Sequence, residues 1–256
     1  MKYILLSFDL EEFDLPREFN IEINDEEMYK ISYEGCNNLL KILNVKSTFF
    51  VTANFARKYP KLIKKLSKKN EIGLHGDEHK DNYLKLSEEE VFIKLKKSKE
   101  TIEKIISKKI KGFRAPRLQF DKYNVLKKLN FEYDSSYIPS YAPGRYNNLF
   151  GKRKIFIKDG IKVIPISVIP ICRLPLAWYA LRNLGLWYWK LGTIFNKEIC
   201  LDFHPWEFIN IKEYNIPFLF KRNTGKYLEL KLENYIKWCL KKNYNFVTFS
   251  DYLSQN

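Results

Sequence analysis

The sequence has 256 residues, of which 45% are hydrophobic and 16% aromatic, and this suits one large domain with a buried core. It contains no low-complexity segment and no internal repeat, so its composition excludes a disordered or repeat protein. The formal net charge of +15 is compatible with nucleic acid, an anionic membrane surface or a phosphate-bearing substrate as partner. Because the lysines are spread along predicted helices, solvated helix faces explain most of this charge, and we expect no nucleic-acid binding.

The four cysteines give no sign of a zinc finger or a redox pair. Cys36, Cys172, Cys200 and Cys239 are widely spaced, and free thiols in a reducing compartment are the simplest interpretation. At the N-terminus, Lys2 precedes a short apolar run that soon reaches acidic residues, which is unlike a signal peptide. These features predict a cytoplasmic protein.

Strand-like and helix-like segments alternate along the whole chain. Apolar runs rich in β-forming residues predict strands at residues 3–8, 47–52, 71–74, 110–114, 131–134, 163–168, 199–204 and 246–249. Amphipathic spacing predicts helices at residues 28–43, 53–66, 87–106, 121–129 and 227–241. Pro60 marks a break in the second helix, and Ser87 with Glu90 has the pattern of a helix start. The alternation predicts a mostly parallel sheet with helical crossovers, in a single domain spanning residues 1–256.

Polar residues stand at the ends of five predicted strands. Asp9, His75, Arg114, Asp134 and His204 all lie at predicted C-terminal strand ends. In barrels of alternating strands and helices, the chemistry takes place at this end of the strands. The shared position therefore predicts one site to which all five segments contribute.

Two of the three histidines, His75 and His79, lie four residues apart. If the backbone turns helically after the strand, both imidazoles lie on one face and can share a metal ion. The alternative is a pair of surface histidines on a polar loop. A metal site needs a further carboxylate from elsewhere in the chain.

Other segments supply candidate catalytic groups. Asp9 and Glu11 lie two residues apart at a strand end and share one face, so one could act as a base and the other as a metal ligand. Arg114, in a loop stiffened by proline, would orient Asp9 and keep it ionised. Ordinary loop acids, a surface arginine and a structural histidine at His204 are the alternative interpretations.

Five motifs in this order resemble those of the polysaccharide deacetylases, carbohydrate esterase family 4. They are Ser7-Phe8-Asp9-Leu10-Glu11, His75 to His79, Arg114-Ala115-Pro116, Asp134-Ser135-Ser136 and His204-Pro205-Trp206-Glu207-Phe208, so the resemblance covers most of the chain. Leu10 occupies the place where many members carry a metal-binding Asp, and Glu11 is the substitute. This Asp-x-Glu motif, the segment from Tyr141 to Tyr146 and the His-Pro-Trp-Glu motif are similar to a branch associated with bacterial surface-polysaccharide biosynthesis.

The resemblance implies a fold and a set of residue roles. The fold would be α/β, a distorted, incomplete (β/α) barrel with about seven parallel strands. Asp9 would be the general base, Arg114 its orienting partner and His204 the general acid. Glu11, His75 and His79 would bind a divalent metal, with zinc favoured over manganese, cobalt or nickel. Substrate contacts are expected from six further residues: Arg117, Asp134, Ser135, Arg145, Tyr146 and Trp206.

The activity implied by the resemblance is metal-dependent removal of an N-acetyl group from a sugar. The sugar would be a precursor of a bacterial surface glycan, carried on a nucleotide or a lipid diphosphate. Some relatives cleave other C–N bonds without a metal, so a metal-independent hydrolase is one alternative, and a non-catalytic glycan- or membrane-binding module is another. As general acid, His204 needs a neighbouring carboxylate to stay protonated, and we expect Asp202 or Asp134 to supply it.

Residues 174–195 form an unusually aromatic segment. Pro175, Arg182, Gly185 and Lys190 interrupt it, which argues against a membrane span. A barrel helix packed into the core is the first interpretation, and a lipid-facing or sugar-stacking surface is the alternative. A lipid-facing patch near basic residues would suit peripheral contact with the inner face of a membrane.

Overall fold

Strand β1 (Tyr3–Leu10) is an interior strand of the sheet, and all of its residues after Tyr3 are buried. The computed structural model describes residues 1–255. In it, β1 pairs in parallel with β2 (Thr48–Val51) on one side and with β10 (Glu198–Phe203) on the other. The start of β1 also pairs with the short strand β11 (Asn245–Phe246). The continuous apolar run predicted as a central strand is therefore confirmed.

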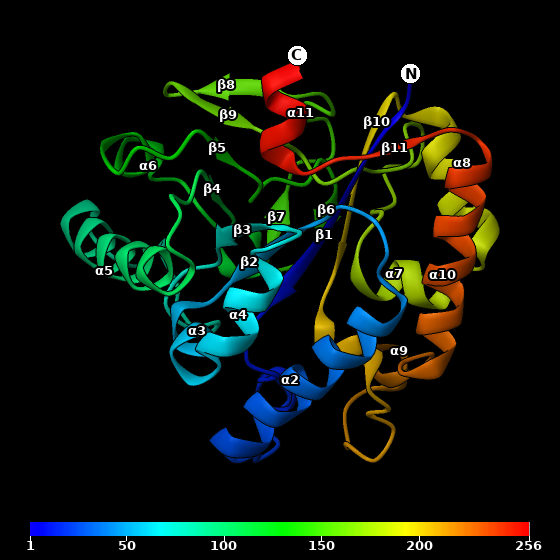
Figure 1. Cartoon of the computed structure of the whole chain (residues 1–256), viewed down its shortest axis with the longest axis horizontal. Helices are drawn as coiled ribbons and strands as arrows, with labels where there is room; N and C mark the ends of the chain where they lie inside the picture. Colours follow the sequence, from blue (N-terminus) through cyan, green and yellow to red (C-terminus); the bar gives the residue numbers. More distant parts are fainter. Residues whose placement is uncertain (256) are drawn as a thin grey trace.

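The main sheet has the strand order β10-β1-β2-β3-β4-β5-β9-β8 (Figure 1). The strands beyond β2 are β3 (Glu71–Leu74), β4 (Gly112–Phe113), β5 (Tyr133–Asp134), β9 (Ile161–Val163) and β8 (Phe156–Lys158). Every neighbouring pair from β10 to β9 is parallel, and β8 is antiparallel to β9. The curled, open sheet confirms the predicted fold class, an incomplete (β/α) barrel with about seven parallel strands.

An extended segment, residues 164–168, bridges strands β5 and β10 of the open sheet. The Ile164 N–H donates to the Asp134 carbonyl on one side at 2.8 Å, and the Ser167 N–H donates to the Cys200 carbonyl on the other at 3.0 Å. Because these hydrogen bonds go to different strands, the segment forms no regular ladder. The strand predicted up to residue 168 therefore ends with β9.

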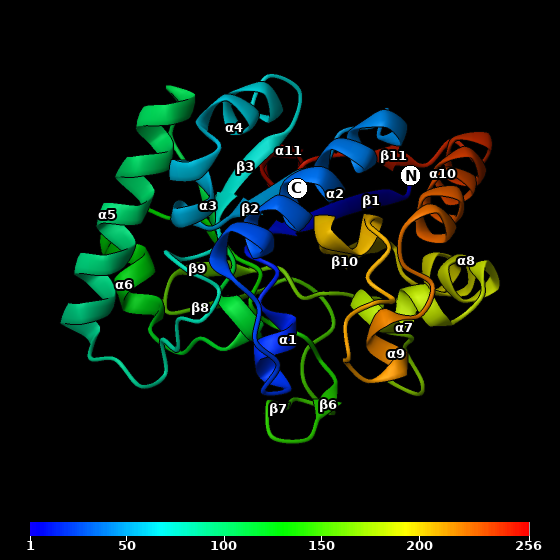
Figure 2. The same ribbon diagram turned by 90° about the horizontal axis from the view of Figure 1, so that it is seen from below.

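Helices surround the sheet, with α5 and α6 near β4 and β5, and α8 and α10 near β10 (Figure 1, Figure 2). The longer helices are α2 (Asp25–Ile42), α3 (Ala53–Lys58), α4 (Pro60–Leu66), α5 (Glu88–Ile106), α6 (Tyr123–Lys128), α7 (Trp178–Asn183), α8 (Leu186–Phe195) and α10 (Lys226–Lys241). Short turns complete the set: α1 (Leu15–Glu18), α9 (Phe218–Lys221), and the 3-10 turns η1 (Pro116–Leu118) and η2 (Pro205–Phe208). The break at Pro60 and the capping box before α5 agree with the prediction.

The C-terminal segment differs from the prediction. The strand expected at residues 246–249 is only β11, and helix α11 (Phe249–Gln255) follows it. The Thr48 hydroxyl accepts the Phe249 N–H at 3.2 Å, and the Glu71 carboxylate accepts the Ser250 N–H at 3.0 Å. Side chains of two strands thus stabilise the first turn of α11, which a local sequence pattern does not reveal.

The hairpin of β6 (Tyr141–Ala142) and β7 (Tyr146–Asn147) was not predicted, because strands of two residues carry no usable periodicity. The aromatic segment forms the helices α7 and α8. Trp189 is buried, whereas Tyr179 and Trp187 are 40% and 63% exposed, so the core-helix interpretation holds for one face only. Among residues 1–255, the structure has no helix with both the length and the apolar content that crossing a membrane requires.

Helix α2 packs its backbone directly against the turn that follows β10. A Cβ atom at Gly35 would lie only 2.1 Å from the backbone carbonyl oxygen of Pro205. Pro205 comes directly after His204. The lack of a side chain at Gly35 therefore determines how closely α2 approaches the end of β10.

We expect Gly35→Ala to destabilise the protein, because the added methyl group must displace backbone atoms. Overpacking of this kind costs about 1–3 kcal/mol, which exceeds the gain of about 1 kcal/mol from the better helix propensity of alanine. Urea denaturation measures the change, with Glu34→Ala on the exposed side of the same helix as the control. A Gly35→Ala midpoint no lower than that of the control would contradict the prediction.

Candidate active site

The C-terminal ends of the parallel strands open into a cavity of about 560 Å³. Three of the five predicted strand-end residues line it, Asp9, His75 and His204, together with Glu11 and His79 from the segments that follow the strands. Arg114 follows β4 and lies behind this wall, fully buried. The structure thus brings the chemically active groups of four distant segments to one edge of the sheet, where parallel strands place them.

His75 and His79 present the same ring nitrogen to Glu11. Nε2 of His75 lies 3.0 Å from Glu11 Oε2, and Nε2 of His79 lies 3.5 Å from the same oxygen. Each Nδ1 has its own partner, the Arg114 carbonyl at 2.9 Å for His75 and the Asp14 carboxylate at 2.6 Å for His79. Partners of this kind fix the tautomer and ring orientation of metal-binding histidines.

The backbone between the two histidines is an irregular loop. Gly76 has a φ of 83°, a left-handed conformation that suits glycine. Even so, the rings of His75 and His79 lie 6.3 Å apart at an interplanar angle of 19°. The pairing expected from the four-residue spacing is present, although the helical turn assumed for it is wrong.

Glu11 lies close enough to His75 and to His79 to share a divalent cation with either ring. Two ligand atoms on one tetrahedral ion, each about 2.0–2.2 Å from it, lie roughly 3.4 Å apart, close to the 3.0 and 3.5 Å between the nitrogens and the carboxylate here. Buried carboxylates also outnumber buried guanidinium groups around the site: Asp9, Glu11, Asp14, Asp202 and Glu207 against Arg114 and Arg182. A further positive charge is therefore favourable, and zinc accepts this combination of nitrogen and oxygen donors.

A second group, Asp9, Asp202 and His204, has ligand atoms that all lie within 4.8 Å of one another. Arg114 already occupies this corner of the site, because its Nη1 donates to Asp9 Oδ1 at 2.7 Å and also bonds Asp202 Oδ1. The guanidinium would repel a metal ion placed between the same carboxylates. A metal ion bound by this group would therefore have to compete with Arg114.

The two carboxylates that Arg114 bonds, Asp9 and Asp202, differ in their pKa. Burial raises the pKa of Asp202 to about 7, with Arg114 opposing and Asp9 reinforcing the shift. Burial also acts to raise the pKa of Asp9, but Arg114 and the neighbouring histidines outweigh it and hold that pKa below its ordinary value. Asp9 is therefore the ionised member of the pair, as a general base must be.

His204 is oriented by Glu207. Its Nδ1 lies 3.0 Å from Glu207 Oε1, which also accepts the backbone N–H of His204 at 2.8 Å. Burial lowers the pKa of His204, but Glu11 and Glu207 outweigh it and raise the pKa to about 10. Of the two partners expected for His204, Asp202 also raises this pKa but contributes less than Glu11 and Glu207, and Asp134 is not among the causes. The η2 turn folds the chain back so that the carboxylate three residues later becomes the partner.

Glu207 has its own counter-charge in Arg182 of α7. The two side chains are fully buried and form an ion pair through Arg182 Nη1 and Glu207 Oε2. Arg182 Nη2 also donates to the Phe220 carbonyl at 2.8 Å. A single arginine within an apolar aromatic segment is a signal for such a pairing, because a buried arginine needs an acidic partner. The sequence analysis used Arg182 only as evidence against a membrane span.

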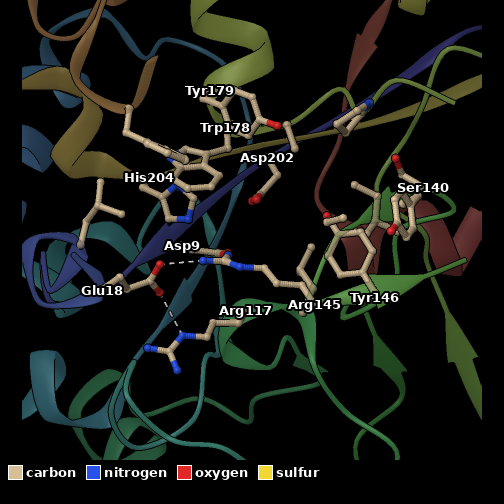
Figure 3. Close-up of a pocket in the computed structure, with 18 of the residues that line it drawn as sticks. Asp9, Glu18, Arg117, Ser140, Arg145, Tyr146, Trp178, Tyr179, Asp202 and His204 are labelled. Carbon is tan, nitrogen blue, oxygen red and sulfur yellow. Dashed lines mark hydrogen bonds and ion pairs between the residues drawn. The ribbon is translucent and has the colours of Figure 1, made fainter. Parts of the chain in front are cut away.

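Four of the six residues predicted to contact substrate line the cavity: Arg117, Arg145, Tyr146 and Trp206. Glu18 joins the two arginines, 3.1 Å from Arg117 Nε and 2.6 Å from Arg145 Nη2 (Figure 3). Trp206 is almost fully buried, and its indole N–H donates to Glu11 Oε1 at 3.5 Å. It therefore supports Glu11 more than it contacts a substrate.

Trp178 and Glu18 were not predicted as site residues. Figure 3 shows Trp178 beside His204, and their ring centroids lie 6.0 Å apart. Trp178 has a φ of 45°, a strained conformation for a bulky residue. Short helices at the strand ends bring both side chains to the cavity, and no local sequence pattern indicates where such short helices point.

Asp134 and Ser135, the other two residues predicted to contact substrate, lie outside the cavity lining and are fully buried. The Ser135 hydroxyl accepts a hydrogen bond from Arg114 Nη2 at 3.0 Å and donates to the Ile164 carbonyl at 3.0 Å. Ser135 therefore supports Arg114, the Asp134 carboxylate accepts the Ser136 N–H at 3.1 Å, and neither residue forms the wall expected for it.

We expect Arg182→Leu to lower the free energy of unfolding by about 3–5 kcal/mol, because it leaves the buried Glu207 carboxylate without its cation. The double variant Arg182→Leu/Glu207→Leu should lose less than this single variant. Urea denaturation measures both, with Arg57→Leu as the control, since the half-exposed Arg57–Asp77 pair is worth about 0–1 kcal/mol. An equal loss in the single and double variants would contradict the assigned role of this ion pair.

The family model of polysaccharide deacetylases matches residues 18–133. This stretch includes the histidine pair and Arg114, while the segments with Asp9, Glu11 and His204 lie outside it. A search of curated proteins gives no match to the sequence.

Solved structures share the fold over nearly the whole chain. A protein of Mycobacterium smegmatis assigned as a polysaccharide deacetylase matches 99% of this chain and 89% of its own, with 19% identity and a TM-score of 0.69. The Bc1960 peptidoglycan N-acetylglucosamine deacetylase matches 97% and 86%, with 17% identity and a TM-score of 0.55. A pseudoenzyme of carbohydrate esterase family 4 from Bacillus anthracis matches 98% and 64%, with 13% identity and a TM-score of 0.58. Residues 18–133 are thus similar to the polysaccharide deacetylase family, and the chain shares its fold with solved structures of carbohydrate esterase family 4.

Proposed function

We propose that this protein is a metal-dependent hydrolase that removes an N-acetyl group from a sugar by cleaving the amide C–N bond. The observation that carries the proposal is the orientation of both histidine Nε2 atoms toward Glu11, in a cavity that Asp9 and His204 also line. The polysaccharide deacetylase match supports an N-acetylated sugar as the substrate class.

Glu11, His75 and His79 would hold the ion, and zinc is the metal that this donor set favours over manganese, cobalt or nickel. A divalent cation bound there supplies a lowered pKa for water and polarisation of the acetyl oxygen. The protein contributes ligands whose rings are already oriented, since both Nδ1 atoms have fixed partners.

Asp9 is the proposed general base and His204 the proposed general acid. Arg114 donates to Asp9 at 2.7 Å, which keeps the carboxylate ionised and oriented to accept a proton from the attacking water. Glu207 holds the Nδ1 of His204, so the opposite ring nitrogen, 3.8 Å from Glu11 Oε1, is the one that would protonate the amine nitrogen as the C–N bond breaks. An amine leaves slowly without this proton, which is why a positioned acid accelerates the step.

We infer that the sugar belongs to a precursor of a bacterial surface glycan, carried on a nucleotide or lipid diphosphate in the cytoplasm. Arg117 and Arg145 in the cavity wall support an anionic carrier, because guanidinium groups bind phosphate oxygens well. The aromatic rings of Tyr146 and Trp178 in the same wall offer flat apolar faces for a sugar ring. Peripheral contact with the inner face of a membrane would bring a lipid-linked substrate to this cavity.

We expect acetate release from at least one N-acetylated sugar, nucleotide sugar or lipid-linked sugar. The release should stop in chelator and return with zinc. Release that continues unchanged in chelator would favour a metal-independent hydrolase. No release from any member of the panel would favour a non-catalytic module, as in the pseudoenzyme with the same fold.

Two matched variants separate metal binding from general damage to the fold. Glu11→Gln should lose zinc, measured by elemental analysis after dialysis, together with acetate release. Glu78→Gln should keep both, because Glu78 bonds Asn54 and Lys80 outside the cavity lining. Retention of zinc by Glu11→Gln would reject the assigned ligand set.

We expect His204→Ala to lose about 10²–10⁴-fold in kcat, the usual contribution of a general acid, while its zinc content stays unchanged. Steady-state kinetics and elemental analysis measure the two quantities on one preparation. Near-wild-type kcat would show that the acid is a solvent water or Glu207. Loss of zinc would instead favour the group of Asp9, Asp202 and His204 as the metal site.

A further inference from the structure

Two segments beside the cavity carry positive charge without negative charge. Residues 171–197 and 214–228 together contain seven Lys and Arg residues and no Asp or Glu, although the whole chain has 30 acidic residues. These segments include α7, α8 and α9, and both views place α9 beside α7 (Figure 1, Figure 2). The side chain of Asn183 in α7 also bonds the Leu219 carbonyl in α9 at 2.8 Å. Arg182 is buried against Glu207 and Lys226 pairs with Glu229, so five basic side chains of these two segments give this part of the surface its positive charge.

The same segments expose large apolar side chains, which we name the rim: Ile171, Leu174, Tyr179, Phe218 and Leu219. Their exposed fractions range from 40% for Tyr179 to 92% for Ile171. Leu174 and Tyr179 also line the cavity, as does Phe220, the next residue of α9. Clusters of exposed apolar residues on a soluble surface mark places where it meets a partner. The rim therefore indicates a contact at the mouth of the candidate active site.

Three cations are interspersed with the rim in the sequence. Arg173 lies between Ile171 and Leu174, and Lys221 and Arg222 follow Leu219. Arg173 and Lys221 donate to backbone carbonyls, at 3.1 and 2.8 Å, and the guanidinium of Arg222 lies 5.6 Å from the ring of Phe218. These partners carry no negative charge, so the rim keeps its full positive charge for an external partner.

We propose that the rim docks on the surface of an anionic lipid bilayer. Aromatic and aliphatic side chains with lysine and arginine around them are typical of surfaces that lie in the headgroup region. Anionic lipids attract such cations, and this attraction extends over about a Debye length. A second copy of this chain is a poorer partner, because its rim would bring the same charge.

Docking in this orientation places the mouth of the cavity against the lipid headgroups. A sugar carried on a lipid phosphate or diphosphate then reaches Asp9 and His204 without leaving the bilayer surface. This consequence for the substrate rests on the proposed function, whereas the docking itself does not.

Flotation of the full chain with vesicles tests the docking directly. The protein should float with vesicles of phosphatidylcholine and phosphatidylglycerol, and less with phosphatidylcholine alone or in high salt. The variant Phe218→Ser/Leu219→Ser should reduce the partition coefficient about tenfold or more, because the rim loses much of its apolar area. The matched control is Ile93→Ser/Ile157→Ser, which removes exposed apolar residues of α5 and β8 and should float like the wild type.

Three results would overturn the docking proposal. In the first, the wild-type protein does not float with the anionic vesicles. In the second, the two double variants float equally. In the third, light scattering shows a dimer that only the rim variant abolishes. The last result would assign the rim to a protein interface. Thermal melting of all variants establishes that each one is folded.

Acetate release separates the docking from the proposed function. The rim variant should retain turnover of a soluble N-acetylated sugar and lose turnover of a lipid-linked sugar in vesicles, because Phe218 and Leu219 lie outside the cavity lining. Vesicle binding without any acetate release would refute the proposed function alone. Acetate release by a wild-type protein that does not bind vesicles would refute the docking alone.

Discussion

The buried guanidinium of Arg114 is the interaction on which the rest of the site depends. It donates to Asp9 of β1, to Asp202 of β10 and to Ser135 after β5, so one side chain connects four strands across the inside of the curled sheet. A buried cation is tolerated only when its partners are in place. The hydrogen bonds of this one guanidinium therefore hold both the strand ends and the candidate catalytic groups at their distances from one another.

One guanidinium does not balance the acidic groups around it, and this excess shapes the histidines. Burial lowers the pKa of His79, but Glu11 and Asp14 outweigh it and raise that pKa to about 9. The site thus favours positive charge on or beside its imidazoles. Protonation and metal binding compete for the same Nε2 atoms. Either one adds positive charge that balances the excess of buried carboxylates. At His79 this competition explains why ligand geometry and a raised pKa occur together.

Periodicity and strand ends were sufficient to predict the sheet and the convergence of Asp9, His75 and His204, because parallel strands end at one edge. The partners of these residues could not be predicted in the same way. Whether Glu207 or Asp202 reaches His204 depends on the η2 turn, and the pairing of Glu207 with Arg182 depends on the direction of α7. These are tertiary features that strand and helix patterns do not encode. The placement of Asp134 and Ser135 failed for a related reason, since it depends on where a strand of two residues stops.

Glu18 has a consequence for how an anionic ligand enters the cavity. Its carboxylate bonds both Arg117 and Arg145, so both arginines already have an ion-pair partner within the protein. A phosphate group that binds them must take the place of an internal carboxylate, and the free-energy gain is only the difference between two ion pairs. Ions in solution screen both pairs, so the exchange depends less on ionic strength than simple addition would. Glu18 thus makes the cavity selective for anions that satisfy both arginines better than one carboxylate does.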